Sequence, residues 1–477
     1  KAIRRQRQMC IRDSRDRNHP CVWLWEPILN ETWYPADFAK NTLDLVAQEY
    51  PYPYCYSGCD SEARGHEVYP VLFTHPANAD KDWAIKKLDP KITYFTREWG
   101  DNVDDWNSHN SPSRVARNWG EQAMLIQAWH YAAPNYPYTC YDVLYRTPRQ
   151  HVGGCLWHSF DHQRGYHPDP FYGGLMDVFR QPKYSYYMFQ AQRSPKKQDR
   201  LFETGPMVYI AHEMTPFSPK DVTVYSNCDE VRLTYNKGGK SLTYTKPVSR
   251  EGMPSPIITF KDVYNFMIDK NMSMKEGRQK EVFLLAEGLI NGKVVATHKV
   301  CPARRPSKLL LWIDNENTEL KADGSDFVTV IAAIADKNGN IKRLNNYYVK
   351  FHIEGEGRIL GGANVLANPA PVKWGTAPIL VQSTLKPGKI KITASVLFEG
   401  SQMPVSAELE LESKPSAYPL IYASEEAALI PMKSDSQSFP ITAKSQKELE
   451  KEKAVKEQNE RKLKEVEQQQ ADFGEKK

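Results

Sequence analysis

Residues 22–49 read VWLWEPILNETWYPADFAKNTLDLVAQE, a mostly apolar run followed by an amphipathic one. The apolar part, residues 22–29, predicts a strand, and residues 35–49 predict a helix. Pro35 suits the first turn of that helix, where its missing N–H is harmless. A strand followed by a helix is the repeating unit of a parallel sheet, so this stretch predicts parallel strand–helix units.

The same alternation continues to about residue 195. We predict four more strands, at 52–57, 67–73, 91–96 and 152–160. We predict three more helices, at 81–88, 114–131 and 183–192. Five strand–helix units do not close an eight-stranded barrel, so either the sheet is open or three units are missing.

The first 14 residues, KAIRRQRQMCIRDS, favour the second alternative, that three strand–helix units are missing. They are basic and lack the apolar region of a secretory signal. Their end, MCIRDS, resembles a translated sequencing adapter. We therefore expect residues 1–14 to be non-native and the natural protein to continue upstream. A periplasmic or extracellular location stays open for the same reason.

From about residue 205 the sequence changes to short strands separated by polar turns. Predicted strands lie at 222–226, 231–235, 282–287, 293–299, 327–335, 348–353 and 389–397. Asn291-Gly292 has the chemistry of a tight hairpin turn, because both residues tolerate a positive φ. This spacing predicts two antiparallel β-sandwiches, at 205–303 and 305–413.

The end of the chain differs again in composition. Residues 414–446 mix Ser and Pro and are typical of a linker. Residues 447–477 are dense in charge, with Glu and Lys or Arg four residues apart. Such pairs support a solvated helix, so we predict a charged helical tail.

The composition argues against several classes of protein. A net charge of +5 on 477 residues does not call for a nucleic-acid partner. No run of 18 apolar residues exists, so no membrane span is predicted. Cys55 and Cys59 lack a second pair at zinc-finger spacing, and His158 and His162 lack an acidic helix context. We therefore expect neither a metal nor another cofactor, and the oligomeric state stays open.

Two glutamates follow predicted strands. Asn30-Glu31 ends the first strand between tryptophans, and Glu98-Trp99 follows the fourth. A carboxylate at the C-terminal end of a barrel strand, walled by indoles, loses hydration, and its pKa should rise as a general acid requires. Two carboxylates about 5–5.5 Å apart define retaining glycoside hydrolysis, one as acid/base and one as nucleophile. Structural roles remain alternatives: a loop contact for Glu31, and an ion pair with Arg97 for Glu98.

Other side chains near the predicted strand ends suit a sugar ligand. Trp157 can stack on a sugar ring. Asp161 can accept hydrogen bonds from sugar hydroxyl groups. His158 is a candidate for a sugar or loop contact. Tyr69 could orient a nucleophile through its hydroxyl, with core packing as an equal alternative. Nine of the 11 Trp and nine of the 12 His lie in the first 200 residues, which agrees with an aromatic site there.

These residues, in this order, resemble glycoside hydrolase family 2, the β-galactosidase-type (β/α)8 enzymes. The motifs of the first part are RNHP at 17–20, NE at 30–31, Glu98, GCLWHSFD at 154–161 and QPKYSYY at 181–187. Downstream motifs are VYSNCDEV at 224–231, AEG at 286–288, DKNGN at 336–340 and EGEGRILGG at 354–362. The resemblance implies the C-terminal part of a (β/α)8 TIM barrel, about strands 4–8, at 15–200. Two immunoglobulin-like β-sandwiches would follow it.

The resemblance also implies roles for single residues. Glu31 would be the acid/base, Glu98 the nucleophile, and Asn30 the partner of the sugar 2-hydroxyl. Trp157 would be a stacking platform for a β-linked oligosaccharide or glycoside. The remaining substrate-binding candidates are Tyr69, Trp99, His158 and Asp161.

The chain departs from the family pattern in two ways. Two β-domains and the first three barrel strands do not precede Asn30-Glu31, so we expect the chain alone to be inactive or nearly so. No Asn-x-Lys follows Glu98 in the barrel, the pattern by which β-glucuronidases hold a uronate carboxylate. A neutral, galactoside-like sugar is therefore favoured. A β-mannosidase, a β-glucuronidase, a non-catalytic carbohydrate-binding protein and a β-sandwich adhesion module remain alternatives.

Overall fold

The computed structural model divides the chain into two units, which we describe separately. Unit 1 comprises Lys1–Pro306, Ala335–Asn345 and Lys373–Gly375, and unit 2 comprises Ser307–Ile334, Asn346–Val372 and Thr376–Lys477. The structure describes residues 16, 18–28, 34–61, 63–76, 88–101, 111–134, 139–163, 170–196, 205–236, 240–245, 252–268, 270, 282–314, 318–397 and 403–417.

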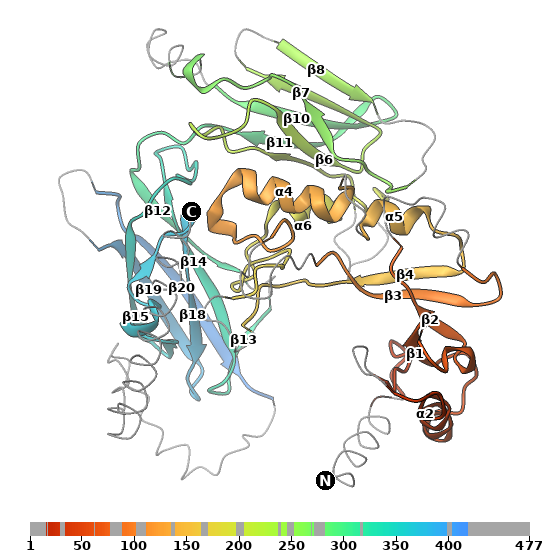
Figure 1. Ribbon diagram of the computed structural model, residues 1–477. Helices are drawn as coiled ribbons and strands as arrows, with labels where there is room; N and C mark the ends of the chain where they lie inside the picture. The colour runs from red at the N-terminus through yellow and green to blue at the C-terminus, as the bar shows by residue number, and fades with distance from the viewer. Residues whose placement is uncertain are drawn as a thin grey trace, which may run out of the picture. The chain divides into compact units, whose positions relative to one another are not determined.

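Four short strands form the first sheet of unit 1 (Figure 1). They are β1 (Ser57–Asp60), β2 (Val71–Phe73), β3 (Thr93–Trp99) and β4 (His151–Leu156), hydrogen-bonded in that order. All three pairings are parallel, which confirms the parallel arrangement of the predicted strands.

The strand predicted at 22–29 is reduced to a single bridge in its described part, residues 22–28. Trp25 pairs with Tyr56 in parallel, with its N–H donating to the Cys55 carbonyl. Pro27 follows two residues later and has no N–H with which to continue a ladder.

Prolines also shorten the next two strands. β1 begins five residues later than predicted, after Pro51 and Pro53. β2 begins directly after Pro70, and a 3₁₀ turn at His66–Val68 occupies the start of the predicted strand. The prediction at 67–73 contains β2, whereas the prediction at 52–57 overlaps β1 only at Ser57.

Helix α2 (Ala36–Glu49) begins immediately after Pro35, as predicted. Ala39 and Val46 lie on its buried face. They belong to an apolar cluster with side chains of the sheet and its approach, namely Ile28, Tyr56, Tyr69, Leu72 and Tyr94. Helix α2 is therefore held by burial of one apolar stripe against the sheet.

Three further helices pack around Trp99 at the end of β3. They are α4 (Glu121–Ala132), α5 (Tyr141–Arg146) and α6 (Tyr184–Gln190). Helix α4 begins later than the predicted residue 114, because Gly120 before it has a φ of 91°, outside the helical region. Helix α5 was not predicted, and residues 81–87 of another predicted helix lie outside the described residues.

Two sheets form the later part of unit 1. β5 (Val208–Ala211), β6 (Val222–Ser226) and β9 (Ile258–Phe260) make the first. β7 (Glu230–Tyr235), β8 (Lys240–Thr245), β10 (Leu284–Ile290) and β11 (Lys293–Val300) make the second, antiparallel in the order β11-β10-β7-β8. Residues from both sheets, among them Val224, Leu233 and Leu284, share one buried cluster. At the turn between β10 and β11, Asn291 and Gly292 have φ values of 51° and 72°, as their chemistry predicted.

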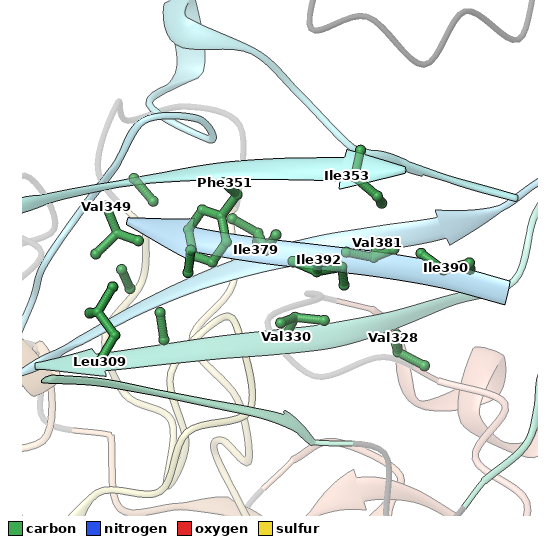
Figure 2. Close-up of a cluster of buried hydrophobic side chains, with 14 of the residues drawn as sticks. Leu309, Val328, Val330, Val349, Phe351, Ile353, Ile379, Val381, Ile390 and Ile392 are labelled. Atoms are coloured by element: carbon green, nitrogen blue, oxygen red, sulfur yellow. The ribbon is translucent and has the colours of Figure 1, made fainter. Parts of the chain in front are cut away.

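Unit 2 also consists of two sheets. One has the order β12 (Lys308–Asp314), β14 (Phe327–Ala335), β18 (Thr376–Ser383), β16 (Gly357–Ile359). The other has the order β13 (Leu320–Ala322), β20 (Ala407–Pro415), β19 (Gly388–Val396), β15 (Tyr348–Gly355), β17 (Ala370–Pro371). Figure 2 shows side chains of both, among them Val330, Phe351, Ile379 and Ile392, meeting in one cluster.

The end of the chain is only partly described. The predicted tail at 447–477 and all but the first four residues of the predicted linker at 414–446 lie outside the described residues. Within the part that the structure describes, no helix combines the length and apolarity needed to cross a bilayer.

Candidate active site

The C-terminal ends of the parallel strands carry a group of charged side chains. Arg97, near the end of β3, forms ion pairs with Glu26 (Nε to Oε1, 2.9 Å) and Asp60 (Nη2 to Oδ1, 3.7 Å). Its guanidinium also lies 4.0 Å from the centre of the Phe73 ring. Parallel strands place their carboxyl ends at one edge of a sheet, which explains why residues distant in sequence meet here.

Glu98 follows Arg97 on β3 and lies within electrostatic reach of this group. Burial raises the pKa of Glu26, and the charges of Asp60 and Glu98 add to that rise while Arg97 opposes it. Burial lowers the pKa of His75, and the negative charges of Asp60 and Glu98 oppose this decrease. The predicted nucleophile thus lies among two further carboxylates and one guanidinium.

Trp157 lies next to the end of β3. Its backbone N–H donates to the Trp99 carbonyl at 2.9 Å, so the residue after β4 is tied to the residue after Glu98. The indole is partly exposed and contacts the rings of His158 and His162, with centroids 4.6 and 5.4 Å away. The structure therefore brings Glu98 and Trp157 to neighbouring strand ends.

His158 is only 6% exposed, in a cluster with His162 and Phe171. Burial lowers the pKa of His158 to about 4, so the ring is neutral near pH 7. The cluster adjoins Trp157. In the described ranges, no group of three or more His, Cys, Asp or Glu side chains suited to a metal occurs.

Asp161 makes a buried ion pair. Its Oδ1 lies 2.7 Å from the Lys183 Nζ and accepts the Gly174 N–H at 2.9 Å. Burial raises the pKa of Asp161, and Lys183 opposes that rise. These contacts account for a structural role, and the contact of Asp161 with a sugar stays a prediction.

Trp99 and Tyr69 are also buried. Trp99 is 5% exposed and packs against Tyr131 and Phe189 among the helices. The Tyr69 hydroxyl donates to the Ala39 carbonyl of α2 at 3.1 Å. Both placements fit the core-packing alternative, and substrate contacts by these two side chains stay predictions.

Asn30 and Glu31 lie outside the described residues, so the structure does not place the predicted acid/base. The sequence interpretation overlooked Glu26, Asp60 and Arg97 as parts of the charged group. A charged residue at the end of each short apolar strand is the signal that could have found them, since such ends converge in a parallel sheet.

A second buried carboxylate lies at the start of α4. Glu121 accepts the Glu213 N–H on Oε1 at 2.8 Å and the Ser218 hydroxyl on Oε2 at 2.5 Å. Burial raises the pKa of Glu121 to about 7, although both hydrogen bonds favour its charged form. The folded state therefore keeps a proton that the unfolded state releases near pH 4.5.

Glu121 should lower stability as pH rises from 4.5 to 7, because its pKa is raised on folding. We expect the free energy of unfolding of the wild type, relative to Glu121→Gln, to fall by about 3 kcal/mol over that window. His212, whose pKa burial lowers to about 4, acts with the opposite sign but is common to both proteins. Urea titrations of both at several pH values measure the difference. A difference that does not change with pH would contradict the prediction.

The chain is similar to known glycoside hydrolases. Residues 311–397 match the family model for glycoside hydrolase family 2 C-terminal domain 5. The chain is 29% identical to a β-galactosidase of Thermoanaerobacter pseudethanolicus over 407 residues, which cover 82% of this chain and 49% of the relative. The chain spans about half the length of the curated relatives that it matches first.

Solved structures share the fold. A β-glucuronidase from glycoside hydrolase family 2 superposes with a TM-score of 0.57 at 20% identity, covering 84% of this chain and 40% of that one. A β-glycosidase from Bacteroides vulgatus superposes with a TM-score of 0.56 at 19% identity, covering 85% and 53%. The fold is thus the multi-domain, β-rich one of these glycosidase structures. The family-model match, the curated relatives and the solved structures together make the chain similar to glycoside hydrolase family 2 proteins.

Proposed function

We propose that the protein is an exo-acting, retaining β-glycosidase of the β-galactosidase type, with Glu98 as nucleophile and Glu31 as acid/base. The observation that carries this proposal is the position of Glu98 at the C-terminal end of β3, tied through the Trp157–Trp99 hydrogen bond to a partly exposed indole. Relatives named β-galactosidase support the choice of activity.

The proposed reaction proceeds in two displacements. A Glu98 carboxylate oxygen attacks the anomeric carbon while Glu31 protonates the glycosidic oxygen, so the bond to the aglycone breaks and a glycosyl ester of Glu98 forms. Glu31, now ionised, then takes a proton from water, whose oxygen displaces Glu98 from the same carbon. Asn30 would hold the sugar 2-hydroxyl, and Trp157 would stack on the ring.

A neutral sugar is the substrate class that the charged group favours. Glu26 and Asp60 add negative charge near Glu98, and in the described part of the chain Arg97 is the ion-pair partner that offsets it. A uronate carboxylate in the same place would be repelled by these groups. The absence of Asn-x-Lys between Glu98 and residue 200 agrees with this preference.

We extend the proposal to the fold. The Trp25 bridge and β1 to β4 would be strands 4–8 of a (β/α)8 barrel, followed by two immunoglobulin-like sandwiches. The parallel order of β1 to β4 and the flanking helices support the barrel. The two pairs of sheets, each with its own buried cluster, support the sandwiches.

Covalent labelling tests the proposed nucleophile. We expect an activated 2-deoxy-2-fluoro-β-galactoside to add one glycosyl unit to the longest natural protein that contains this sequence. Peptide mapping should place the label on Glu98, because the fluorine slows hydrolysis of the ester. A label on another carboxylate would reassign the nucleophile. Turnover of a chromogenic mannoside or glucuronide in preference to the galactoside would reassign the sugar, and binding without hydrolysis would indicate a carbohydrate-binding protein.

We also propose that the 477-residue chain alone hydrolyses β-galactosides poorly or not at all. In the described sheet, β4 is an edge strand and β1 is met on its outer side only by the Trp25 bridge, and such edges leave backbone groups unpaired. A chromogenic galactoside assay of the purified chain measures this directly. Turnover at a rate typical of an enzyme would show that the chain holds a complete site.

A further inference from the structure

Arg114 links the two strand ends that the proposed function uses. It is 1% exposed and pairs with Asp101 through both sides of its guanidinium, Nε to Oδ1 at 2.9 Å and Nη2 to Oδ2 at 2.8 Å. Asp101 lies three residues after Glu98. Because this ion pair is bidentate, it fixes the orientation of the Asp101 carboxylate as well as its distance from Arg114. Arg114 therefore constrains the backbone at Asp101, just after β3.

The Arg114 guanidinium also stacks on an aromatic ring in the segment that follows β4. Its carbon is 3.9 Å from the centroid of Phe171, which is fully buried. Phe171 packs against His158 and His162, with centroids 5.7 and 5.9 Å away, and both imidazoles contact Trp157. The backbones of Phe171 and His162 also exchange two hydrogen bonds.

These contacts form a closed ring of residues. Asp101 follows Glu98 by three residues and forms the ion pair with Arg114. Arg114 stacks on Phe171, which contacts the two histidine rings. The histidine rings in turn contact Trp157. The Trp157 N–H then returns to the Trp99 carbonyl, next to Glu98. A ring of this kind constrains the carboxylate and the indole together, which neither strand end does alone.

We propose that Arg114 is a positioning residue that fixes Glu98 and Trp157 relative to each other. This inference rests on the proposed function in that it assigns the pair to one sugar site. Arg114 itself need not touch the sugar, because its side chain is buried. Misplacement of a reacting group by about 1 Å can cost about 100-fold in rate, so a small shift has a measurable consequence.

Arg114→Lys is the informative substitution. Lysine keeps the charge for Asp101 but lacks the planar fork that binds a carboxylate at two points and stacks on a ring. Arg117→Lys is the matched control. Arg117 is also buried, and it pairs with Asp177 (Nε to Oδ2, 3.0 Å) and Gln181 (3.1 Å).

The kinetic arm compares both variants in the longest natural protein containing this sequence, well below the unfolding temperature of each. We expect Arg114→Lys to lower kcat for a β-galactoside 10- to 100-fold with a smaller change in KM, and to slow fluoro-glycoside labelling of Glu98 equally. Arg117→Lys should lower stability and leave kcat within about threefold. Equal kinetic losses in the two variants, or none in either, would overturn the inference.

The second arm does not depend on activity. In Arg114→Lys, hydrogen exchange should become at least tenfold faster in peptides covering both 98–101 and 157–162, with no change over α2. Arg117→Lys should leave the first peptide unchanged. If the wild type hydrolyses no β-glycoside, the proposed function fails. The hydrogen-exchange experiment alone then tests whether Arg114 links the two segments. Faster exchange in only one of the two peptides, or in neither, would then refute the link.

Discussion

Replacing Glu98 with Gln is expected to reduce kcat/KM for β-galactoside hydrolysis by on the order of 10⁴-fold or more, the scale seen when an enzyme loses its nucleophile. The amide is similar in size to the carboxylate but cannot form the glycosyl ester. The fold should persist, because Glu98 is partly exposed and Arg97 keeps its ion pairs with Glu26 and Asp60.

The matched control for this prediction is Glu67→Gln. Glu67 is an exposed glutamate that lies 3.6 Å from the His66 ring in the 3₁₀ turn before β2. Its amide variant should retain wild-type kinetics. The measurement is a steady-state assay with a chromogenic galactoside, together with circular dichroism of each variant. Wild-type turnover by Glu98→Gln would remove Glu98 from the proposed mechanism.

Replacing Lys183 with Met should destabilise unit 1 by about 3–5 kcal/mol. Lys183 has no exposed side-chain surface, and its Nζ lies 2.7 Å from Asp161 and 2.8 Å from the Tyr172 carbonyl. Removing the ammonium leaves a buried carboxylate without its partner. Because burial raises the pKa of Asp161 and Lys183 opposes this, the loss should shrink as pH falls and Asp161 takes up a proton.

Two companion variants separate charge from packing in this prediction. Asp161→Asn combined with Lys183→Met removes both charges, and should be more stable than Lys183→Met alone. Lys261→Met removes an exposed partner of Asp221 and should have little effect. Denaturant unfolding followed by tryptophan fluorescence reports mainly on unit 1, where ten of the 11 Trp lie. Equal losses for Lys183→Met and Lys261→Met would contradict the role assigned to burial.

Local chemistry predicted much of the fold. Pro35 marked the start of α2, and Asn291-Gly292 marked the hairpin between β10 and β11. In each case a few neighbouring residues favour one backbone conformation, so the information is contained in a short stretch of sequence. Strand lengths were less well predicted, since Pro27 and Pro70 interrupt apolar runs that would otherwise continue.

The candidate site was predictable only in part. The sequence indicated that Glu98 and Trp157 end their strands, and the structure places these ends side by side. It did not indicate that Arg97 pairs with Glu26 and Asp60, because those residues are far apart along the chain. Such ion pairs form where strand ends converge. They cannot be identified from any single segment of the sequence.

The sequence by itself therefore indicated the resemblance to glycoside hydrolase family 2, the parallel strands and the position of Glu98 at a strand end, because motifs and periodicity are properties of neighbouring residues. Only the tertiary structure decided which side chains lie inside. Trp99 and Asp161 have the residue types of a sugar site, yet one packs among helices and the other pairs with Lys183. The ring through Arg114 depends on two contacts between residues more than 50 positions apart, Arg114 with Phe171 and Trp99 with Trp157, which form only when β3, β4 and their loops are packed together.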